Sequence, residues 1–253
     1  MLPGISLMKM SWLLVRRFIR LDLPELKIPR TTILLPGWNR SLISFLRKVM
    51  LEDAYGIMES VDTAIPGLVD VVEVIREAVE KGGKIIVTGA GASALVGMEL
   101  SGQGFETGLP IYCFTNNLSD ANPVSFAKGL GENEGGLSRY IAGIINKDDV
   151  VIAISASGGT GFVYNVLARG REKGATTVAI TENPDTPLGK YADFVIKSNA
   201  KPEGPSSSKI QAAHLAIVHA LAVTLASERG LDAEKAIQFM LPEFIPNKKM
   251  GIK

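Results

Sequence analysis

The sequence predicts an α/β protein: a parallel five-stranded sheet with helices on both faces, preceded by N-terminal helices. Five short runs of β-branched and other apolar residues are separated by stretches with helical periodicity. The runs are nearly continuous rather than alternating, which is typical of strands buried on both faces of a parallel sheet. Apolar residues make up 46% of the chain and charged residues 21%, the usage of a globular protein with a substantial core. The predicted strands are Lys84–Thr88, Ile111–Phe114, Val150–Ile154, Thr176–Ile180 and Phe194–Ile196.

A basic arm, residues 1–38, precedes the predicted domain. Residues 1–50 contain nine Lys and Arg against two Asp and Glu, whereas the whole chain has a net charge of only +1. The stretch Trp12–Arg20 could form a basic amphipathic helix on a membrane surface or an acidic partner. The alternative is a loosely held arm, or sequence upstream of the true start codon, because Met8 and Met10 offer later starts.

A helical hairpin is predicted at the start of the domain, which we place at residues 39–245. Apolar residues recur at helical spacing from Ser41 to Ile65, and Pro66 is expected to end that helix. A second helix is predicted over Gly67–Lys81, and the pair of glycines that follows closes it.

Helical stretches also lie between and after the predicted strands. A long one, rich in Ala and Leu, runs from about Ser207 to Arg229 and ends at Gly230. A short helix is predicted around Asp232–Met240, and residues 246–253 form a polar tail. The remaining predicted helices are 93–106, 136–146, 160–173 and 187–191.

Composition excludes several classes of function. The single cysteine, Cys113, excludes a disulfide framework and multi-cysteine zinc sites, and the two histidines, His214 and His219, exclude histidine-rich metal sites. The near-neutral charge gives no basic surface for nucleic acid. The longest apolar runs have four or five residues, far fewer than the roughly 20 that span a bilayer. We expect a soluble, cytoplasmic protein with no nucleic-acid partner and no membrane span, in which Cys113 and His214 are core residues.

Two turns that follow predicted strands carry the residues of an anion site. They are Gly89–Ser93, with the sequence Gly-Ala-Gly-Ala-Ser, and Ser155–Thr160, with the sequence Ser-Ala-Ser-Gly-Gly-Thr. In an open parallel sheet, ligands bind beyond the carboxyl ends of the strands. Glycines let backbone N–H groups approach an anion, hydroxyls donate to it, and the following helix N-terminus adds positive potential. We predict a phosphate cradle. The alternative is a pair of structural turns, because Ala94 replaces the third glycine of a dinucleotide fingerprint.

The second turn and its surroundings resemble the sugar isomerase (SIS) domain of phosphosugar-binding proteins, over about residues 41–229. The pattern strand-Ser-x-Ser-Gly-x-Thr-helix is followed by Gly-Ala-Thr-Thr-Val-Ala-Ile-Thr181 and by Ala192-Asp193. Within that superfamily the chain is most similar to phosphoheptose (sedoheptulose 7-phosphate) isomerases. The resemblance implies a flavodoxin-like fold and a homotetramer whose active sites lie between adjacent subunits. The segments at that family's spacing are Ser119-Asp120, Ser138-Arg139-Tyr140 and Gln211 with His214 and His219 after it.

The resemblance also implies roles for individual residues. Gln211 and His219 match a helical pair near the reacting carbon, where the histidine is an acid/base and, in some members, a metal ligand. The family's other helical pair is His and Glu, four positions apart, and here Glu99 and Gln103 stand there. A divalent ion such as zinc would be held by these four side chains. The implied substrate-binding residues are Ser93, Ser155, Ser157, Gly158, Thr160, Gln211, Gln103, Asp120 and Ser208.

Three departures from the family's pattern bear on the substrate. Gln103 stands where the family has its general base, and an amide cannot take up a proton. Glu99, one turn earlier on the same face, could supply the carboxylate instead. Ser208 stands where an Asp is frequent, and Gly129-Leu130 replaces an expected Asn-Asp pair.

The chemistry of these residues is that of aldose–ketose isomerisation, which moves a proton between neighbouring carbons through an enediol. A histidine such as His219 can exchange protons near neutral pH, and Glu99 can act as a base if burial raises its pKa. We therefore predict an isomerase of sedoheptulose 7-phosphate or a similar sugar phosphate, with His219 and Glu99 catalytic and no certain cofactor.

Two alternatives stay open. One is a non-catalytic phosphosugar-binding regulatory or scaffold protein, which the amide of Gln103 favours. The other is a lyase similar to N-acetylmuramic acid 6-phosphate etherases, whose Pro-Glu-Gly and Ser-rich stretch resembles residues 202–208, Pro-Glu-Gly-Pro-Ser-Ser-Ser. That family has a glutamate where Gln103 stands, which weakens the second alternative.

Overall fold

The computed structural model describes residues 40–115, 136–201 and 208–231. The chain divides into two units, Met1–Ser44 and Phe45–Lys253, and the account below concerns the second. The predicted basic arm, the helix at Asp232–Met240, the polar tail and Asp120 lie outside the described residues.

The predicted five-stranded parallel sheet is confirmed. The strands follow the spatial order β2-β1-β3-β4-β5, and every neighbouring pair is parallel. Their bounds differ from the prediction by a single residue at most, because continuous apolar runs mark strands with two covered faces. The strands are β1 (Ile85–Gly89), β2 (Ile111–Cys113), β3 (Val150–Ile154), β4 (Thr176–Thr181) and β5 (Phe194–Lys197).

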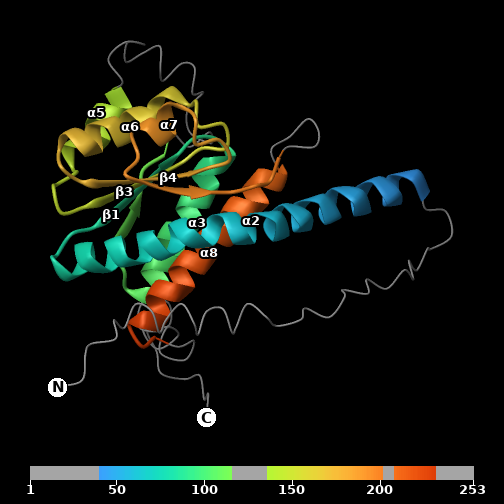
Figure 1. Cartoon of the computed structure of the whole chain (residues 1–253), viewed down its shortest axis with the longest axis horizontal. Coiled ribbons are helices and arrows are strands. Elements are labelled where there is room, and N and C mark those ends of the chain that lie inside the picture. Colours follow the sequence, from blue (N-terminus) through green and yellow to red (C-terminus); the bar gives the residue numbers. More distant parts are fainter. Residues whose placement is uncertain (1–39, 116–135, 202–207, 232–253) are drawn as a thin grey trace, which may run out of the picture. The chain divides into compact units, whose positions relative to one another are not determined.

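Helices cover both faces of the sheet (Figure 1). Alternate residues of β3 enter two different cores: Val150 and Ile152 belong to one, Val151 and Ala153 to the other. The first core also takes side chains from α2 (Arg40–Glu80), α3 (Ala92–Thr107) and α8 (Ser208–Glu228). The second takes side chains from α5 (Gly136–Gly143), α6 (Gly161–Glu172) and α7 (Pro187–Lys190).

The predicted break at Pro66 is wrong, because α2 is one continuous helix from Arg40 to Glu80. Proline inside a helix removes one hydrogen bond and crowds the preceding turn, at a cost of about 3 kcal/mol. Here packing on both sides of the proline offsets that cost. Ala64 and Val71 are both buried in the core. At Gly67 the helix lies so close to β5 that an added Cβ would be 2.4 Å from the Val195 carbonyl oxygen.

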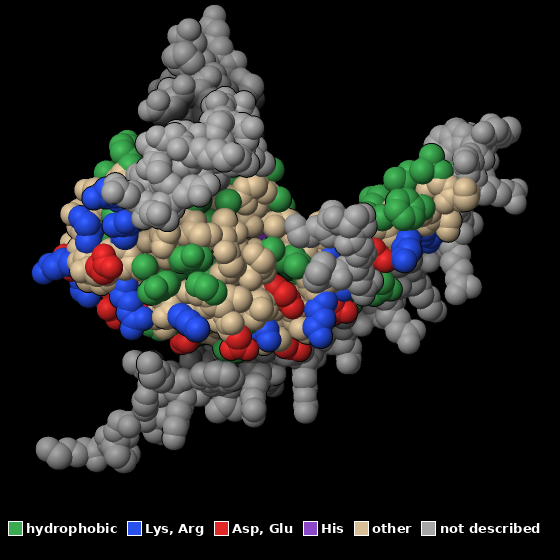
Figure 2. Space-filling view, turned by 90° about the horizontal axis from the view of Figure 1, so that it is seen from above, with side chains coloured by type: hydrophobic (Ala, Val, Ile, Leu, Met, Phe, Trp, Pro, Cys, Tyr) green, Lys and Arg blue, Asp and Glu red, His purple; other side chains and the backbone are tan. Residues whose placement is uncertain are grey.

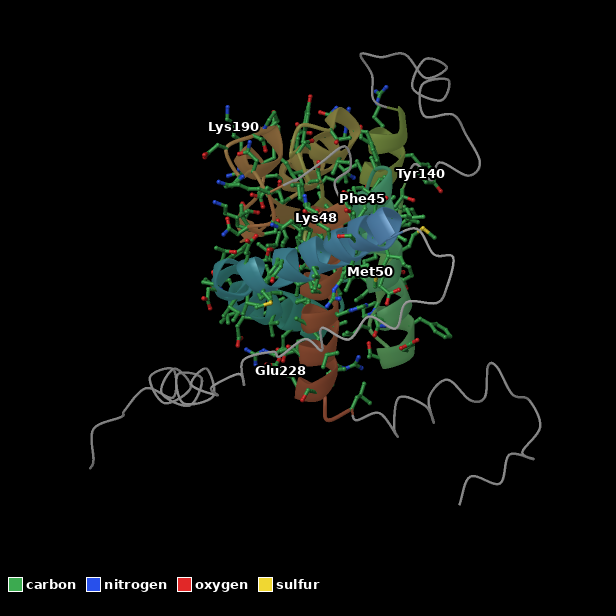
Figure 3. The ribbon with its side chains drawn as sticks, turned by 90° about the vertical axis from the view of Figure 1, so that its right-hand side faces the viewer. Phe45, Lys48, Met50, Tyr140, Lys190 and Glu228 are labelled. Atoms are coloured by element: carbon green, nitrogen blue, oxygen red, sulfur yellow. The ribbon has the colours of Figure 1, made fainter. Side chains whose placement is uncertain are left out.

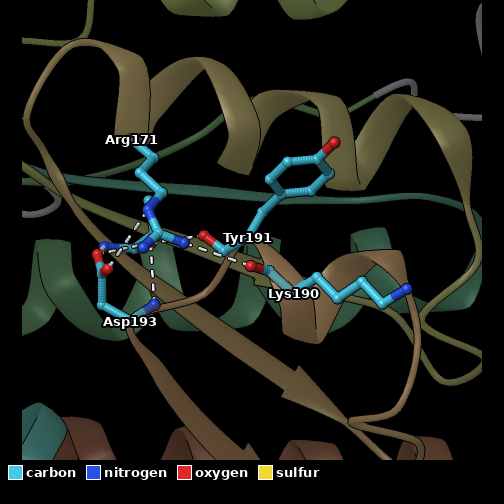
Figure 4. A network of polar contacts seen from close by, with 5 residues as sticks. Arg171, Lys190, Tyr191 and Asp193 are labelled. Carbon is cyan, nitrogen blue, oxygen red and sulfur yellow. Dashed lines mark hydrogen bonds and ion pairs between the residues drawn. The ribbon is translucent and has the colours of Figure 1, made fainter.

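A polar network ties the helices of the second face to the start of β5 (Figure 4). Asp193 Oδ2 accepts hydrogen bonds from the backbone N–H and the hydroxyl of Thr177, at 2.9 and 2.7 Å. Arg171 on α6 donates to the Lys190 carbonyl oxygen at 3.3 Å, and its Nε lies 3.9 Å from Asp193 Oδ1. These contacts lie at the amino ends of β4 and β5, so they brace the sheet at the edge opposite the two predicted loops.

Among the described residues, α8 is the one helix whose length and composition would allow it to cross a membrane. Half of that apolar stretch is buried within the fold, where α8 packs on α3 and shares a core with residues of β1 and β3. Its apolar character therefore reflects its place as a core helix.

Candidate functional site

The two predicted loops begin side by side at the carboxyl edge of the sheet. Gly89 at the end of β1 pairs in register with Ile154 at the end of β3, and neighbouring strands lie about 4.8 Å apart. The sheet continues from β1 to β2 in one direction and from β3 to β4 in the other. This is the position at which open α/β sheets bind their ligands.

Two serine hydroxyls of the loop after β3 accept hydrogen bonds from the loop's own backbone. Ser155 is buried, and its Oγ accepts a hydrogen bond from the Gly158 N–H at 3.1 Å. Ser157 Oγ accepts one from the Gly159 N–H at 3.3 Å. Because the exposed Ser157 Oγ already serves as an acceptor within the loop, its O–H group can donate to an anion. Gly158 has φ +66°, and a Cβ there would lie 2.1 Å from Thr186 Oγ1, so only glycine fits this turn.

The helices that follow the two loops begin without a side-chain cap. Gly91 is the N-cap of α3 and Thr160 is the N-cap of α6, and neither start has a side-chain capping hydrogen bond. The first N–H groups of a helix carry partial positive charge and need acceptors. Ser155 Oγ lies 3.3 Å from Thr160 Oγ1, so hydroxyl donors and a helix N-terminus occur together here.

Helices α3 and α8 run parallel and carry the other predicted residues. Gln211 Nε2 donates to Ser93 Oγ at 3.3 Å, and His219 Nε2 donates to Glu99 Oε1 at 3.0 Å. The partners are 118 and 120 positions apart, and this nearly constant offset is what parallel helices produce. Gln211 thus borders the first loop, next to the buried Ser93.

Glu99, Gln103 and His219 form one cluster on these helices. Gln103 Nε2 donates to Glu99 Oε1 at 3.0 Å, the same oxygen that accepts from His219. The hydrogen bond from His219, and next that from Gln103, lowers the pKa of the Glu99 carboxyl. The condition under which Glu99 was expected to act as a base, a pKa raised by burial, is not met: the side chain is 40% exposed and its pKa is lowered.

The four predicted helical residues lie at two levels along α3 and α8. Six residues separate Ser93 from Glu99, so the Glu99–His219 pair lies about 9 Å farther along α3 than Gln211 and the loops. A zinc ion needs ligand atoms converging at about 2.0–2.3 Å. The described residues contain no group of three His, Cys, Asp or Glu side chains that could hold a metal. Because the His219 Nε2 proton and the Gln103 amide both point at Glu99 Oε1, this cluster does not fit zinc as arranged.

Comparison with known proteins identifies the family. A family model for the SIS domain matches residues 130–227. The N-acetylmuramic acid 6-phosphate etherase of Bacteroides thetaiotaomicron is 30% identical over 201 residues, which cover 76% of this chain and 72% of that protein. The chain belongs to the SIS-domain family. The etherase of Salmonella typhimurium matches this SIS protein at 29% identity over 157 residues, so the chain spans about half (52%) of that relative's length.

Solved structures of other SIS proteins share the fold. The sugar isomerase domain of an RpiR transcription factor from Sphaerobacter thermophilus superposes with a TM-score of 0.62 at 20% identity, covering 81% of this chain and 99% of that one. A phosphoheptose isomerase from Francisella tularensis gives 0.59 at 17% identity, covering 74% and 98%. The NanR protein of Vibrio vulnificus complexed with ManNAc-6P gives 0.59 at 21% identity, covering 81% and 72%. Since an enzyme and a transcription factor share it, the SIS fold alone does not select between catalysis and sensing.

The structure adds one acidic residue that the sequence analysis missed. Glu182 follows β4 at the carboxyl edge of the SIS domain, and its Oε2 accepts hydrogen bonds from Ser198 Oγ and the Ala200 N–H. The sequence feature that could have identified Glu182 is a charged residue directly after a buried strand. Of the predicted residues, Ser208 is exposed as the first residue of α8.

A cavity of about 210 Å³ lies away from this site, at the amino edge of the sheet. Its walls are mainly apolar, with Ile75, Val79, Leu109 and Leu225 among the lining residues. None of the predicted site residues lines it, so it is not the phosphate site of this SIS protein.

Proposed function

We propose that this SIS protein is an enzyme that binds a sugar phosphate and isomerises it by moving a proton between neighbouring carbons. Sedoheptulose 7-phosphate or a similar sugar phosphate is the proposed substrate. The observation that carries the proposal is the Glu99–His219 pair, 3.0 Å apart, on the two helices whose first turns border the phosphate loops. Because the pair lies about 9 Å beyond Ser93 along α3, the substrate binds extended, with its phosphate and its reacting carbons at opposite ends.

The side chains have distinct roles in this scheme. With Nε2–H donated to Glu99, the Nδ1 atom of His219 takes the proton from the carbon next to the carbonyl and later returns it to the former carbonyl carbon. Through the enediol, the carbonyl oxygen gains a proton and the neighbouring hydroxyl loses one. The Glu99 carboxylate, which its lowered pKa keeps ionised, then stabilises the imidazolium ion. Gln211 has a buried Oε1 without a hydrogen-bond partner, and a substrate hydroxyl can donate to it. The scheme routes no step through zinc, which the Glu99–Gln103–His219 cluster does not fit as arranged.

A second subunit belongs to the proposal, because the reacting pair lies open on the α3–α8 face. The His219 and Glu99 side chains are 46% and 40% exposed. Large apolar side chains are exposed on the same two helices, among them Leu95, Met98 and Val223. Burial of this face against another subunit would exclude water from the reaction, and we propose a homotetramer. Cytoplasmic location and the lack of a nucleic-acid partner stay predictions.

An etherase is the second candidate, favoured by the names of the curated relatives. Both reactions begin with removal of the proton next to the carbonyl. An etherase would then expel the ether substituent from the following carbon, whereas an isomerase returns the proton to the neighbouring carbon. Gln103 stands where both families have a glutamate, so this position does not separate the two candidates.

Proton exchange in D₂O tests both candidates. The purified protein is incubated with sedoheptulose 7-phosphate and, separately, with N-acetylmuramic acid 6-phosphate, and the products are followed by NMR. We expect deuterium at the carbon next to the carbonyl and formation of the isomeric sugar from the first compound. Release of lactate from the second compound would select the etherase. Binding of both compounds without any exchange would contradict an enzyme and support the regulatory or scaffold protein.

A further inference from the structure

A chain of three hydrogen-bonded side chains lies beneath the first turns of α8. Glu182 follows β4, Ser198 follows β5, and His214 belongs to α8. Ser198 Oγ lies 3.1 Å from Glu182 Oε2 and 3.0 Å from His214 Nε2. Ser198 and His214 are completely buried, whereas Glu182 is partly exposed at the carboxyl edge of the sheet.

The donors and acceptors of this chain can be assigned from its chemistry. A carboxylate only accepts hydrogen bonds, so the Ser198 hydroxyl donates its one proton to Glu182. Ser198 Oγ must then accept from His214, which places the ring proton on Nε2. Burial lowers the pKa of His214 to about 4, so the ring is neutral and Nδ1 carries only a lone pair. Nδ1 is indeed buried without a hydrogen-bond partner.

The arrangement is not that of a serine hydrolase. In a hydrolase triad the acid contacts the histidine, and the serine is open to substrate. Here the acid contacts the serine, and the serine has no exposed surface. The three groups therefore have a structural role and not a catalytic one.

One end of the network fixes the backbone that leaves β5. Glu182 Oε2 accepts a hydrogen bond from the Ala200 N–H at 2.9 Å, in addition to the one from Ser198. The preceding N–H, of Asn199, donates to the buried Ser60 Oγ of α2 at 2.9 Å. The start of the connection from β5 to α8 therefore depends on side chains rather than on strand pairing.

The other end of the network fixes the helix that carries Gln211. His214 lies three positions after Gln211, slightly less than one helical turn. Gln211 Nε2 reaches Ser93 Oγ beside the first loop. Any sliding or rotation of these turns that removed Gln211 from Ser93 would also break the hydrogen bond between His214 and Ser198.

We propose that Glu182, Ser198 and His214 form a positioning network that holds Gln211 against Ser93 at the border of the phosphate cradle. The inference rests on the proposed function, in which Gln211 binds the sugar part of the substrate. It adds three residues that touch no substrate. The affinity for inorganic phosphate therefore does not depend on the network, whereas the affinity for a sugar phosphate does.

Histidine NMR tests the network itself. The chain has two histidines, so ¹⁵N-histidine labelling of the whole protein gives two ring systems, and His219 serves as the internal reference. We expect His214 in the Nε2–H form, with a downfield Nε2–H proton that moves upfield in Ser198→Ala while the His219 signals stay. A wild-type His214 in the Nδ1–H form would overturn the assignment, because Ser198 would then donate to His214 and not to Glu182.

Ligand affinity tests the positioning. Sedoheptulose 7-phosphate should bind about tenfold more weakly to Glu182→Ala and Ser198→Ala, the effect of one lost hydrogen bond, while inorganic phosphate binds unchanged. Glu182→Gln keeps an acceptor oxygen for Ser198 and Ala200 and should bind like wild type. Glu172→Ala, at the end of α6, is the matched control. Because Glu182 is partly exposed, its two variants decide the matter if Ser198→Ala fails to fold.

The outcomes separate this inference from the proposed function. Equal binding of the sugar phosphate by Glu182→Ala and wild type would overturn the inference alone, as would an equal loss for inorganic phosphate. A wild-type protein that binds inorganic phosphate but no sugar phosphate would overturn the proposed function, and the inference with it.

Discussion

His219 and Gln103 both donate to Glu99 Oε1 and lower the pKa of this carboxyl, so Glu99 stays ionised to a lower pH than an ordinary glutamate. A carboxylate with a low pKa is a weak base, so it serves better to orient and stabilise the histidine than to remove a proton. Loss of a positioned acid or base costs about 10²–10⁴ in rate. We expect His219→Ala and Glu99→Gln each to lose at least about a hundredfold in turnover, measured as deuterium exchange, with unchanged affinity for inorganic phosphate.

Gln103→Glu completes this series of variants. A faster rate would identify Gln103 as the incomplete part of the site. Turnover by His219→Ala at the wild-type rate would remove the imidazole from the mechanism.

Ser157 is the exposed hydroxyl of the phosphate loop, and its Oγ already accepts a hydrogen bond from the Gly159 N–H. Hydrogen bonds to charged groups contribute about 1.5–3 kcal/mol. Ser157→Ala should therefore weaken the binding of inorganic phosphate about tenfold or more, measured by isothermal titration calorimetry. Ser227→Ala, an exposed serine in the last turn of α8, is the control. Equal affinities of the two variants would argue against a phosphate site in this loop.

His214 makes the stability of the protein depend on pH. Burial lowers its pKa from 6.5 to about 4, so the unfolded chain takes up this proton at a higher pH than the folded one. The stabilisation is complete above about pH 6.5 and is lost as the pH falls toward 4; the shift corresponds to about 3 kcal/mol. In His214→Gln, which keeps a donor for Ser198 but does not titrate, the free energy of unfolding should fall less steeply over this range. The free energy of unfolding is measured by urea denaturation at each pH. An equally steep fall for wild type and His214→Gln would contradict a lowered pKa of His214.

At the scale of the elements, the contact between α2 and β5 has no room for a side chain at Gly67. A Cβ there would lie 2.4 Å from the Val195 carbonyl oxygen, a backbone atom that cannot rotate away. Gly67→Ala should lower the free energy of unfolding by about 1–3 kcal/mol or more, measured by chemical denaturation. Gly102 on α3 has open space around it, so Gly102→Ala should stabilise by about 0.5–1 kcal/mol. A neutral Gly67→Ala would mean that α2 does not pack there as described.

The same elements show how far sequence reasoning reaches. The strands were predictable because burial on both faces requires an apolar residue at nearly every position of a strand. Pro66 misled the prediction because its rule is local, whereas the packing of Ala64 and Val71 depends on the distant β5. The pKa shift of Glu99 was out of reach for the same reason, since it requires the parallel alignment of α3 and α8. The position of Ser155 and Ser157 in the loop between β3 and α6 was predictable because the loop motif consists of consecutive residues.

At the scale of the whole molecule, exposed apolar side chains gather on the first half of α2. Figure 2 shows hydrophobic side chains at this end of the helix, and Figure 3 shows Phe45 and Met50 there. Met50 is 74% exposed and Met58 63%, and apolar patches of this kind mark interaction surfaces.

The proposed tetramer should be visible by light scattering at micromolar concentration. The double variant Met50→Glu, Met58→Glu should have a lower molar mass with an unchanged circular dichroism spectrum, because charges are costly in an apolar interface. Asp62→Asn and Asp70→Asn, at exposed positions of the same helix, serve as controls. A monomeric wild type would contradict the tetramer and leave the Glu99–His219 pair exposed to water.

The close approach of Gly67 to Val195 also constrains how the chain folds as it is synthesised. The two residues are 128 positions apart, so α2 leaves the ribosome long before the strand on which it packs. In the interval its core face, with Ala64, Val71 and Ile75, has no sheet to cover it and depends on chaperones or on transient contacts to avoid aggregation. β3, α6 and β4 follow one another directly, and Val150 pairs with Thr176 after a short crossover. Folding of the nascent chain can therefore start in the middle of the sequence, while its first long helix is among the last elements to reach its native contacts.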